Sequence, residues 1–207
     1  CRRFSAKNSL TATGLISMNG MQGRFQVDFK KPDYYKLVLK FGPMSLAQGY
    51  DGTIAWSTDM NGKSTVLQGM EKQDIMRNLY FETYAYLLDP DKINTYNYVH
   101  DTTENGTTYH VVNFYPYQND TVVCWYNSKT GLREKQIGSM DMLTVITEIS
   151  TYKKIGHFLF PLESKTIMAA ANSTIESKID SVSFEPEFPA DHFAMPGLQP
   201  EDFHFPD

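Results

Sequence analysis

Residues 30–59 are the most constraining stretch of the sequence, because they combine two alternating segments with two turn signals. Apolar side chains occupy every second position in residues 35–41, which is the period of a strand with one buried face. Gly42-Pro43 follows this segment and Asp51-Gly52 follows the next, since glycine and proline supply turn geometries that β-branched residues resist. The stretch therefore predicts antiparallel strands joined by tight turns.

The same alternation recurs along most of the chain and predicts about ten or eleven strands. Asn-Gly dipeptides between several of these segments predict hairpins. Residues 165–171 and 174–184 are predicted to be the last two strands. In the final strand the apolar positions change phase, which predicts a bulge or bend near Asp180-Ser181.

Residues 70–88 break the alternation and predict the one helix of the chain, since their apolar residues recur at helical spacing. These apolar positions are Ile75, Met76, Leu79, Tyr80, Tyr84, Leu87 and Leu88. Many antiparallel strands with one inserted helix favour a mainly β fold. We expect a strongly curved antiparallel sheet, or an unclosed barrel, that wraps around the helix as a helical plug.

The chain of 207 residues contains no internal repeat and no interior linker, so we expect a single domain over residues 1–207. Prolines recur from about residue 186, which argues against a regular strand in the C-terminal segment. Its apolar residues are expected to dock this segment onto the sheet. They are Phe188, Phe193, Met195 and Leu198.

Composition and motifs argue against several classes of function. The formal net charge is −5 and the basic residues are scattered, whereas a nucleic-acid partner needs a basic surface. None of the five histidines has a metal-binding spacing, and the sequence contains no nucleophile or phosphate-binding motif. We therefore expect no catalytic residue, no cofactor and no metal. Convergence of His100, His110 and a carboxylate in a cavity would instead favour an enzyme.

The two cysteines are interpreted differently. Cys124 alternates with Val122 and Tyr126 and is predicted to be a small core residue. For Cys1 two interpretations stay open: a lipid-modified first residue of a mature lipoprotein, or an ordinary thiol at an arbitrary chain boundary. Lipidation would give peripheral, lipid-anchored membrane association without a spanning segment.

Several short motifs follow one another in a recognisable order. Lys31-Pro32-Asp33 precedes an aromatic strand, and Asp51-Gly52 stands ahead of Trp56. Phe160-Pro161 and Phe184-Glu185-Pro186 follow near the C-terminal end. This order resembles the periplasmic lipoprotein-carrier (LolA-like) family of outer-membrane lipoprotein-sorting proteins. The resemblance implies an unclosed β-barrel whose concave side holds acyl chains. Lys31 occupies the position where such carriers often have an arginine, whose planar contacts lysine cannot reproduce.

From the resemblance we expect a non-catalytic binding protein of the periplasm or cell envelope. It would be monomeric and would hold a lipid or the acyl chain of an acylated protein in an apolar trough. The residues expected to contact the ligand are Phe25, Val27, Phe29, Lys31, Leu37, Leu39, Trp56, Met76, Leu79 and Tyr80. Two alternatives stay open: these residues form a filled core, or the fold serves as a protein-interaction or regulatory module that binds an envelope or membrane-anchored partner.

Overall fold

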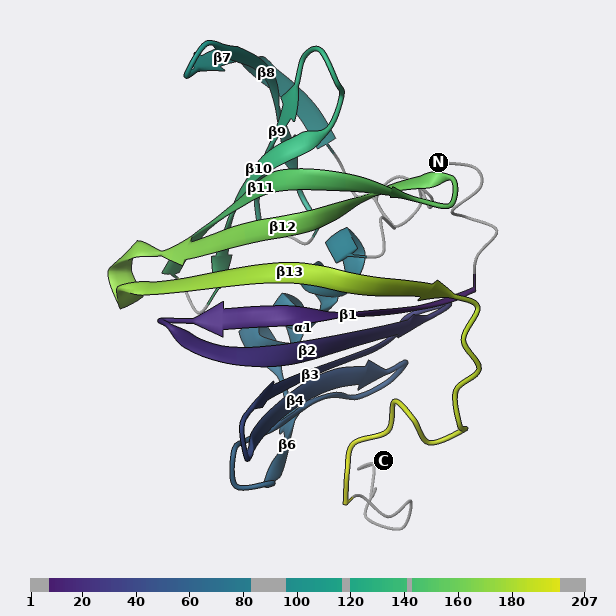
Figure 1. The fold of residues 1–207 in the computed structure, drawn as a ribbon. Helices are drawn as coiled ribbons and strands as arrows, with labels where there is room; N and C mark the ends of the chain where they lie inside the picture. Colours follow the sequence, from purple (N-terminus) through teal and green to yellow (C-terminus); the bar gives the residue numbers. More distant parts are fainter. Residues whose placement is uncertain (1–7, 83–95, 117–119, 141–142, 198–207) are drawn as a thin grey trace, which may run out of the picture.

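The computed structural model describes residues 8–82, 96–116, 120–140 and 143–197. Within these ranges thirteen strands form one antiparallel sheet, and Figure 1 shows it as a curved, unclosed wall. The strands are β1 (Ser9–Met18), β2 (Met21–Lys30), β3 (Tyr34–Phe41), β4 (Met44–Asp51), β5 (Ala55–Thr58), β6 (Ser64–Leu67), β7 (Tyr96–Glu104), β8 (Thr107–Phe114), β9 (Val122–Asn127), β10 (Arg133–Met140), β11 (Leu143–Ile155), β12 (Phe158–Met168) and β13 (Ser173–Phe184). The predicted mainly β fold with an unclosed barrel is therefore confirmed.

The order of the strands explains why the sheet is open. It runs β6-β5-β4-β3-β2-β1-β13-β12-β11-β10-β9-β8-β7, so every neighbouring pair is consecutive in sequence except β1 and β13. The two free edges, β6 and β7, are consecutive in the chain, and the helix α1 (Gly69–Glu82) lies in the connection between them. The helix lies behind the sheet in Figure 1. We call the face that α1 contacts the inner face and the opposite one the outer face.

Helix α1 packs against both halves of the sheet. Ile75 and Leu79 join Tyr35 of β3 and Ala55 of β5 in one buried cluster. A second cluster contains helix residues together with strands β8 and β9. Its buried members are Tyr80, Phe81, Phe114, Val122 and Cys124. The sequence predicted a helix over residues 70–88, and its positions 83–88 lie outside the described residues.

The structure corrects two details of the predicted strands. It contains thirteen strands in the described part of the chain instead of ten or eleven. The strand predicted at residues 165–171 is instead β12, which begins at Phe158, and residues 169–171 form a 3-10 turn. Pro161 obscured the first half of β12. The strand tolerates this proline because β12 is bulged beside it: Glu163 pairs with Thr151 and Pro161 with Tyr152, so Leu162 is an extra residue.

The predicted bulge in β13 is confirmed. Ser181 pairs with Thr13 and Ile179 with Gly14, so Asp180 is the extra residue. One inserted residue returns the following side chains to the same face of the sheet. For this reason Ile179 and Val182 both point to the inner face, although their spacing in sequence is odd.

The C-terminal segment contacts outward-facing residues of β2, β3 and β5. Phe193 is buried, as predicted, and its ring contacts Tyr34 at 5.6 Å. Its backbone oxygen accepts a hydrogen bond of 2.9 Å from Nε1 of Trp56. The backbone oxygen of His192 accepts one from Nζ of Lys36, also at 2.9 Å. Leu198, which was also predicted to dock, lies outside the described residues.

A buried carboxylate fixes the same segment to the sheet. Asp28 of β2 is only 1% exposed. Its two oxygens accept hydrogen bonds from Oγ1 of Thr11 and Nε2 of Gln26, and contact Nε2 of His192 at 2.8 Å. Burial of a carboxylate is costly unless its oxygens are hydrogen-bonded, and here three partners meet that requirement. The His192 ring also stacks on Phe188.

Candidate functional site

The inner face of β2 and β3 carries five of the residues predicted to contact a ligand. Phe25 lies opposite Leu39 and Val27 lies opposite Leu37, so these pairs share one face with Phe29. All five side chains are partly exposed. The two strands therefore present a continuous apolar surface that is only partly covered by the described chain.

The helix closes one end of this surface. Met76 and Leu79 belong to the cluster that contains Val27, Phe29 and Leu37. Phe25 and Leu39 lie further along the strands, outside that cluster. Tyr80, predicted to join the same lining, instead packs in the second cluster with Phe81 and Phe114. The predicted helix residues are thus divided between the two halves of the sheet.

Trp56, which was predicted to contact a ligand in the trough, lies on the outer face of the sheet. Ala55 points to the inner face, so Trp56, the next residue of β5, points to the outer face. Its ring is fully buried there, against Gly49 and the C-terminal segment. A Cβ at Gly49 would lie 2.6 Å from the ring, so glycine is the residue that makes room for it. The inner-face surface therefore does not include Trp56.

Lys31 lies in the turn between β2 and β3, at one end of the apolar surface. Its backbone N–H donates a hydrogen bond of 2.8 Å to the backbone oxygen of Asn8. Tyr34 pairs with Asp51, so the Lys31-Pro32 turn and the Asp51-Gly52 turn occur at the same end of the sheet. The two motifs of the predicted resemblance therefore lie at the same end of the sheet.

Sequence reasoning missed the contribution of the second half of the sheet. Val112 and Cys124 face each other across β8 and β9, on the face that contacts Tyr80 and Phe81. The inner residues of β1 and β13 were missed as well. They include Leu10, Ala12, Ile16, Ile179, Val182 and Phe184. Alternation along each strand was visible in the sequence, but only the register reveals which faces coincide.

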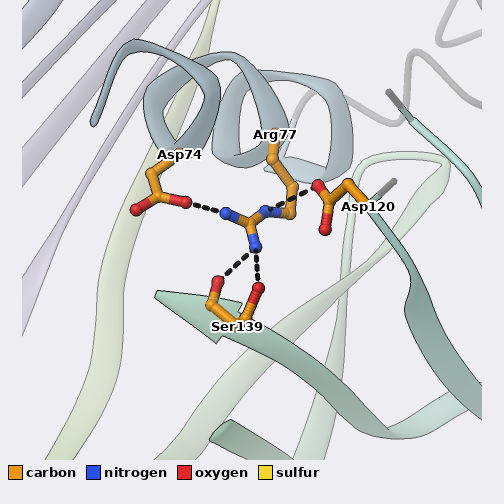
Figure 2. A network of polar contacts seen from close by, with 4 residues as sticks. All are labelled: Asp74, Arg77, Asp120 and Ser139. Atoms are coloured by element: carbon orange, nitrogen blue, oxygen red, sulfur yellow. Dashed lines mark hydrogen bonds and ion pairs between the residues drawn. The ribbon is translucent and has the colours of Figure 1, made fainter. Parts of the chain in front are cut away.

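A buried arginine connects α1 to the second half of the sheet (Figure 2). Arg77 forms an ion pair with Asp74 of the same helix, and its Nε lies 3.4 Å from Oδ2 of Asp120. Its Nη1 donates a hydrogen bond to the backbone oxygen of Ser139 at the end of β10, and also contacts the Ser139 hydroxyl at 3.5 Å. The Arg77 guanidinium thus connects α1, the segment that leads into β9, and strand β10.

Within the described ranges, His100 and His110 lie on opposite faces of their hairpin. His110 lies opposite Asp101, and its Nδ1 is 2.6 Å from Oδ1 of that residue. This hydrogen bond holds the pKa of the Asp101 carboxyl below its ordinary value. His100 lies opposite Val111 on the other face of the hairpin. Among the described residues no group of three or more His, Cys, Asp or Glu side chains is arranged to hold a metal ion.

Cys124 is buried in the second cluster, as predicted for a core residue. Desolvation raises the pKa of its thiol to about 11, although Arg133 opposes the shift. Because the thiolate is the reactive form, we expect folded protein to react with a thiol reagent at least ~100-fold more slowly than unfolded protein. The measurement is colorimetric thiol titration of a Cys1→Ser variant in mildly alkaline buffer, with and without denaturant. Equal rates in the two buffers would contradict this expectation.

The outer face of the central strands carries charged side chains, unlike the apolar inner face of β2 and β3. A shallow depression of about 460 Å³ lies there, and its rim is rich in charge. The charged residues that line it are Glu148, Glu163, Lys165, Glu176 and Lys178. Nζ of Lys178 contacts Oε1 of Glu163 at 2.8 Å, and this hydrogen bond lowers the pKa of the Glu163 carboxyl. Such a lattice of exposed charges is typical of a face in contact with water.

The geometry defines a class of protein: an unclosed antiparallel barrel with a helix across its inner, apolar face. None of the helices in the described ranges is long and apolar enough to cross a membrane. No family of known sequences matches the chain, and no curated protein matches it.

Solved structures nevertheless share this fold over nearly the whole chain. A DUF1329 family protein from Desulfovibrio piger is 14% identical, with a TM-score of 0.67, and the match covers 93% of this chain and 92% of that one. A LolA superfamily protein from Nitrosomonas europaea is 13% identical, with a TM-score of 0.64 and 90% of each chain covered. A putative outer membrane lipoprotein-sorting protein domain from Vibrio parahaemolyticus is 11% identical, with a TM-score of 0.58, covering 97% and 93%. The chain has the LolA-like fold, and the resemblance predicted from its motifs is confirmed at the level of the fold.

Proposed function

We propose that this protein is a non-catalytic binding protein of the cell envelope that holds a lipid or lipoprotein acyl chain against its inner face. The observation that carries the proposal is the apolar surface of β2 and β3, which stays partly exposed next to the buried face of α1. A filled core would bury these side chains almost completely. An acyl chain gains about 0.8 kcal/mol for each methylene group that it buries, so such a surface suffices for affinity without polar chemistry.

The comparisons support the proposal through the fold. One structural neighbour is described as a LolA superfamily protein and another as a putative outer membrane lipoprotein-sorting protein domain. We propose the same setting for this chain, in the periplasm or at the envelope, as a monomer. In this proposal Cys1 is the lipidated residue that would anchor the protein peripherally.

The experiment places a charge on the inner face. Leu39→Glu adds a carboxylate to the apolar surface outside the helix cluster, whereas Lys40→Glu adds the same group to the outer face one residue later. We expect Leu39→Glu to weaken binding of a fluorescent fatty acid by ~10-fold or more, which corresponds to about 1.4 kcal/mol. Lys40→Glu should bind like the unmodified protein.

The same protein, purified from an envelope fraction, provides an independent measurement by native mass spectrometry. A co-purifying lipid that is retained by Lys40→Glu and lost from Leu39→Glu supports the proposal. Absence of lipid from all three proteins, together with unchanged fatty-acid binding by Leu39→Glu, would contradict it.

A second candidate function is a protein-interaction module of the same fold. The observation in its favour is the free edge strand β7, on which Tyr96, Tyr98 and Val99 are exposed. An exposed edge can accept a strand from a partner protein. Recovery of a stoichiometric envelope protein whose binding is abolished by Thr102→Pro, with no lipid bound, would favour this function over the first.

A further inference from the structure

The middle of the inner face carries hydroxyl groups. Ser164 of β12 lies opposite Ser177 of β13, and their hydroxyl oxygens are 2.8 Å apart. Thr147 of β11 lies opposite Thr166 of β12, and their hydroxyl oxygens are 3.0 Å apart. We call these four residues the hydroxyl stripe. All four side chains are partly exposed.

The sheet register places the hydroxyl stripe between apolar residues. On one side Thr166 pairs with Ile175, and Ile175 pairs with Met18 of β1. On the other side Thr147 pairs with Gln136, which pairs with Cys124 in the second helix cluster. Side chains directly opposite one another share a face. The inner face is therefore apolar near β1 and near β9, and over β11 to β13 it carries four hydroxyl groups among apolar side chains.

The same strands use very different residues on their two faces. Outward positions of β12 and β13 alternate with the hydroxyl stripe and are occupied by charged residues. They are Glu163, Lys165, Glu176 and Lys178. A water-facing surface would carry such charges on both sides, and a filled core would carry branched aliphatic residues. Four hydroxyl groups match neither environment. They suit a ligand whose surface is mostly apolar and carries a few oxygen atoms.

The hydroxyl stripe also has hydrogen-bonding capacity left over. Each pair holds two hydroxyl protons and uses one of them between its members, so the second can be donated to another acceptor. Around the hydroxyl stripe the described inner-facing positions carry no charge. They are Val145, Thr147, Ile149, Ser164, Thr166, Met168, Ile175, Ser177 and Ile179. A carboxylate or phosphate placed there would lose its hydration without gaining a cation, whereas an ester carbonyl needs only a donor.

We propose that the hydroxyl stripe binds the uncharged oxygen atoms of a lipid ester, while the acyl chain lies on the apolar surface beside it. This inference rests on the proposed function, because it assigns a specificity to the same inner face. It predicts that the protein prefers neutral acyl esters to free fatty acids of the same chain length.

The test is displacement of a fluorescent naphthylamine probe from the delipidated full-length protein. The competitors are monopalmitoylglycerol, an uncharged ester, and palmitate, which has the same chain and a carboxylate. We expect half-displacement by the ester at a concentration roughly 10-fold lower than by palmitate. The paired variants Ser164→Ala/Ser177→Ala and Thr147→Val/Thr166→Val should each reduce this ratio about 5-fold, the worth of one hydrogen bond.

A matched control is Thr58→Val/Ser64→Ala, which removes a hydroxyl pair of similar separation, 3.0 Å, on β5 and β6. These residues lie on the outer face, since they alternate with Ala55 and Leu67 of the helix cluster, and the ratio should stay unchanged. Equal displacement by the two competitors in the unmodified protein would overturn the inference while the proposed function stands, and this result needs no variant to fold. Failure of the probe and of both lipids to bind would overturn both.

Discussion

Replacing Arg77 by methionine should lower the free energy of unfolding by about 3–5 kcal/mol, the cost of leaving buried charges without their partner. The arginine side chain is 8% exposed and lies between two carboxylates, Asp74 and Asp120, which are 18% and 13% exposed (Figure 2). Methionine keeps the helical preference and much of the length of arginine. The decrease in the free energy of unfolding therefore measures the effect of the missing charge and hydrogen bonds. Equilibrium denaturation with urea measures it.

The matched control for Arg77 is Arg24, which also pairs with an aspartate. Nη2 of Arg24 lies 3.3 Å from Oδ2 of Asp180, but the two side chains are 65% and 37% exposed. Because water screens such a pair, Arg24→Met should change the free energy of unfolding by less than ~1 kcal/mol. Adding Asp74→Asn and Asp120→Asn to Arg77→Met should recover part of the loss, since the stranded charges disappear. Equal effects of the two arginine substitutions would contradict this account of α1.

Replacing Phe193 by alanine should destabilise the protein by about 3 kcal/mol, because a buried aromatic side chain is lost. The Phe193 ring contacts Tyr34, Phe188 and His192, and its backbone oxygen accepts the hydrogen bond of Trp56. When this segment leaves the sheet, the fully buried indole of Trp56 becomes accessible. In a Trp125→Phe background, acrylamide should therefore quench the remaining fluorescence of the Phe193→Ala protein more strongly.

Met195 provides the comparison for the C-terminal segment, since it lies two residues further on and is partly exposed. Met195→Ala should cost less than ~1 kcal/mol and leave quenching of Trp56 unchanged. If Phe193→Ala left both stability and quenching unchanged, the C-terminal segment would not be what buries Trp56.

Local patterns in the sequence predicted most of the fold. The alternation of Phe25, Val27 and Phe29 identified a strand and its apolar face, and the phase change near Asp180 identified the bulge. These signals are local because strand period and turn chemistry depend on neighbouring residues. Pro161 concealed the start of β12 because the bulge at Leu162 that accommodates the proline is visible only in the register with β11.

The candidate site was less predictable because it depends on which faces meet. Ala55 and Trp56 are adjacent, and the larger residue appeared to be the better candidate for an apolar lining. The structure places the small one on the inner face and covers the large one with residues 137 positions away. The hydroxyl stripe has the same origin, since no single strand reveals that Thr147 and Thr166 lie side by side. Pairing between distant segments carries this information, and composition does not.

The antiparallel pairing of β1 with β13 determines the order in which the parts of the sheet can fold. Every other strand pairs with a neighbour in sequence, so β1 to β6 and β7 to β13 are two meanders of low contact order. Their union brings together residues such as Leu10 and Phe184, which closes a loop of most of the chain. The entropy of that closure, roughly 4–5 kcal/mol for a loop of this size, falls on a single pair of strands. We therefore expect the two meanders to form early and independently. The pairing of β1 with β13 should be the last step of folding.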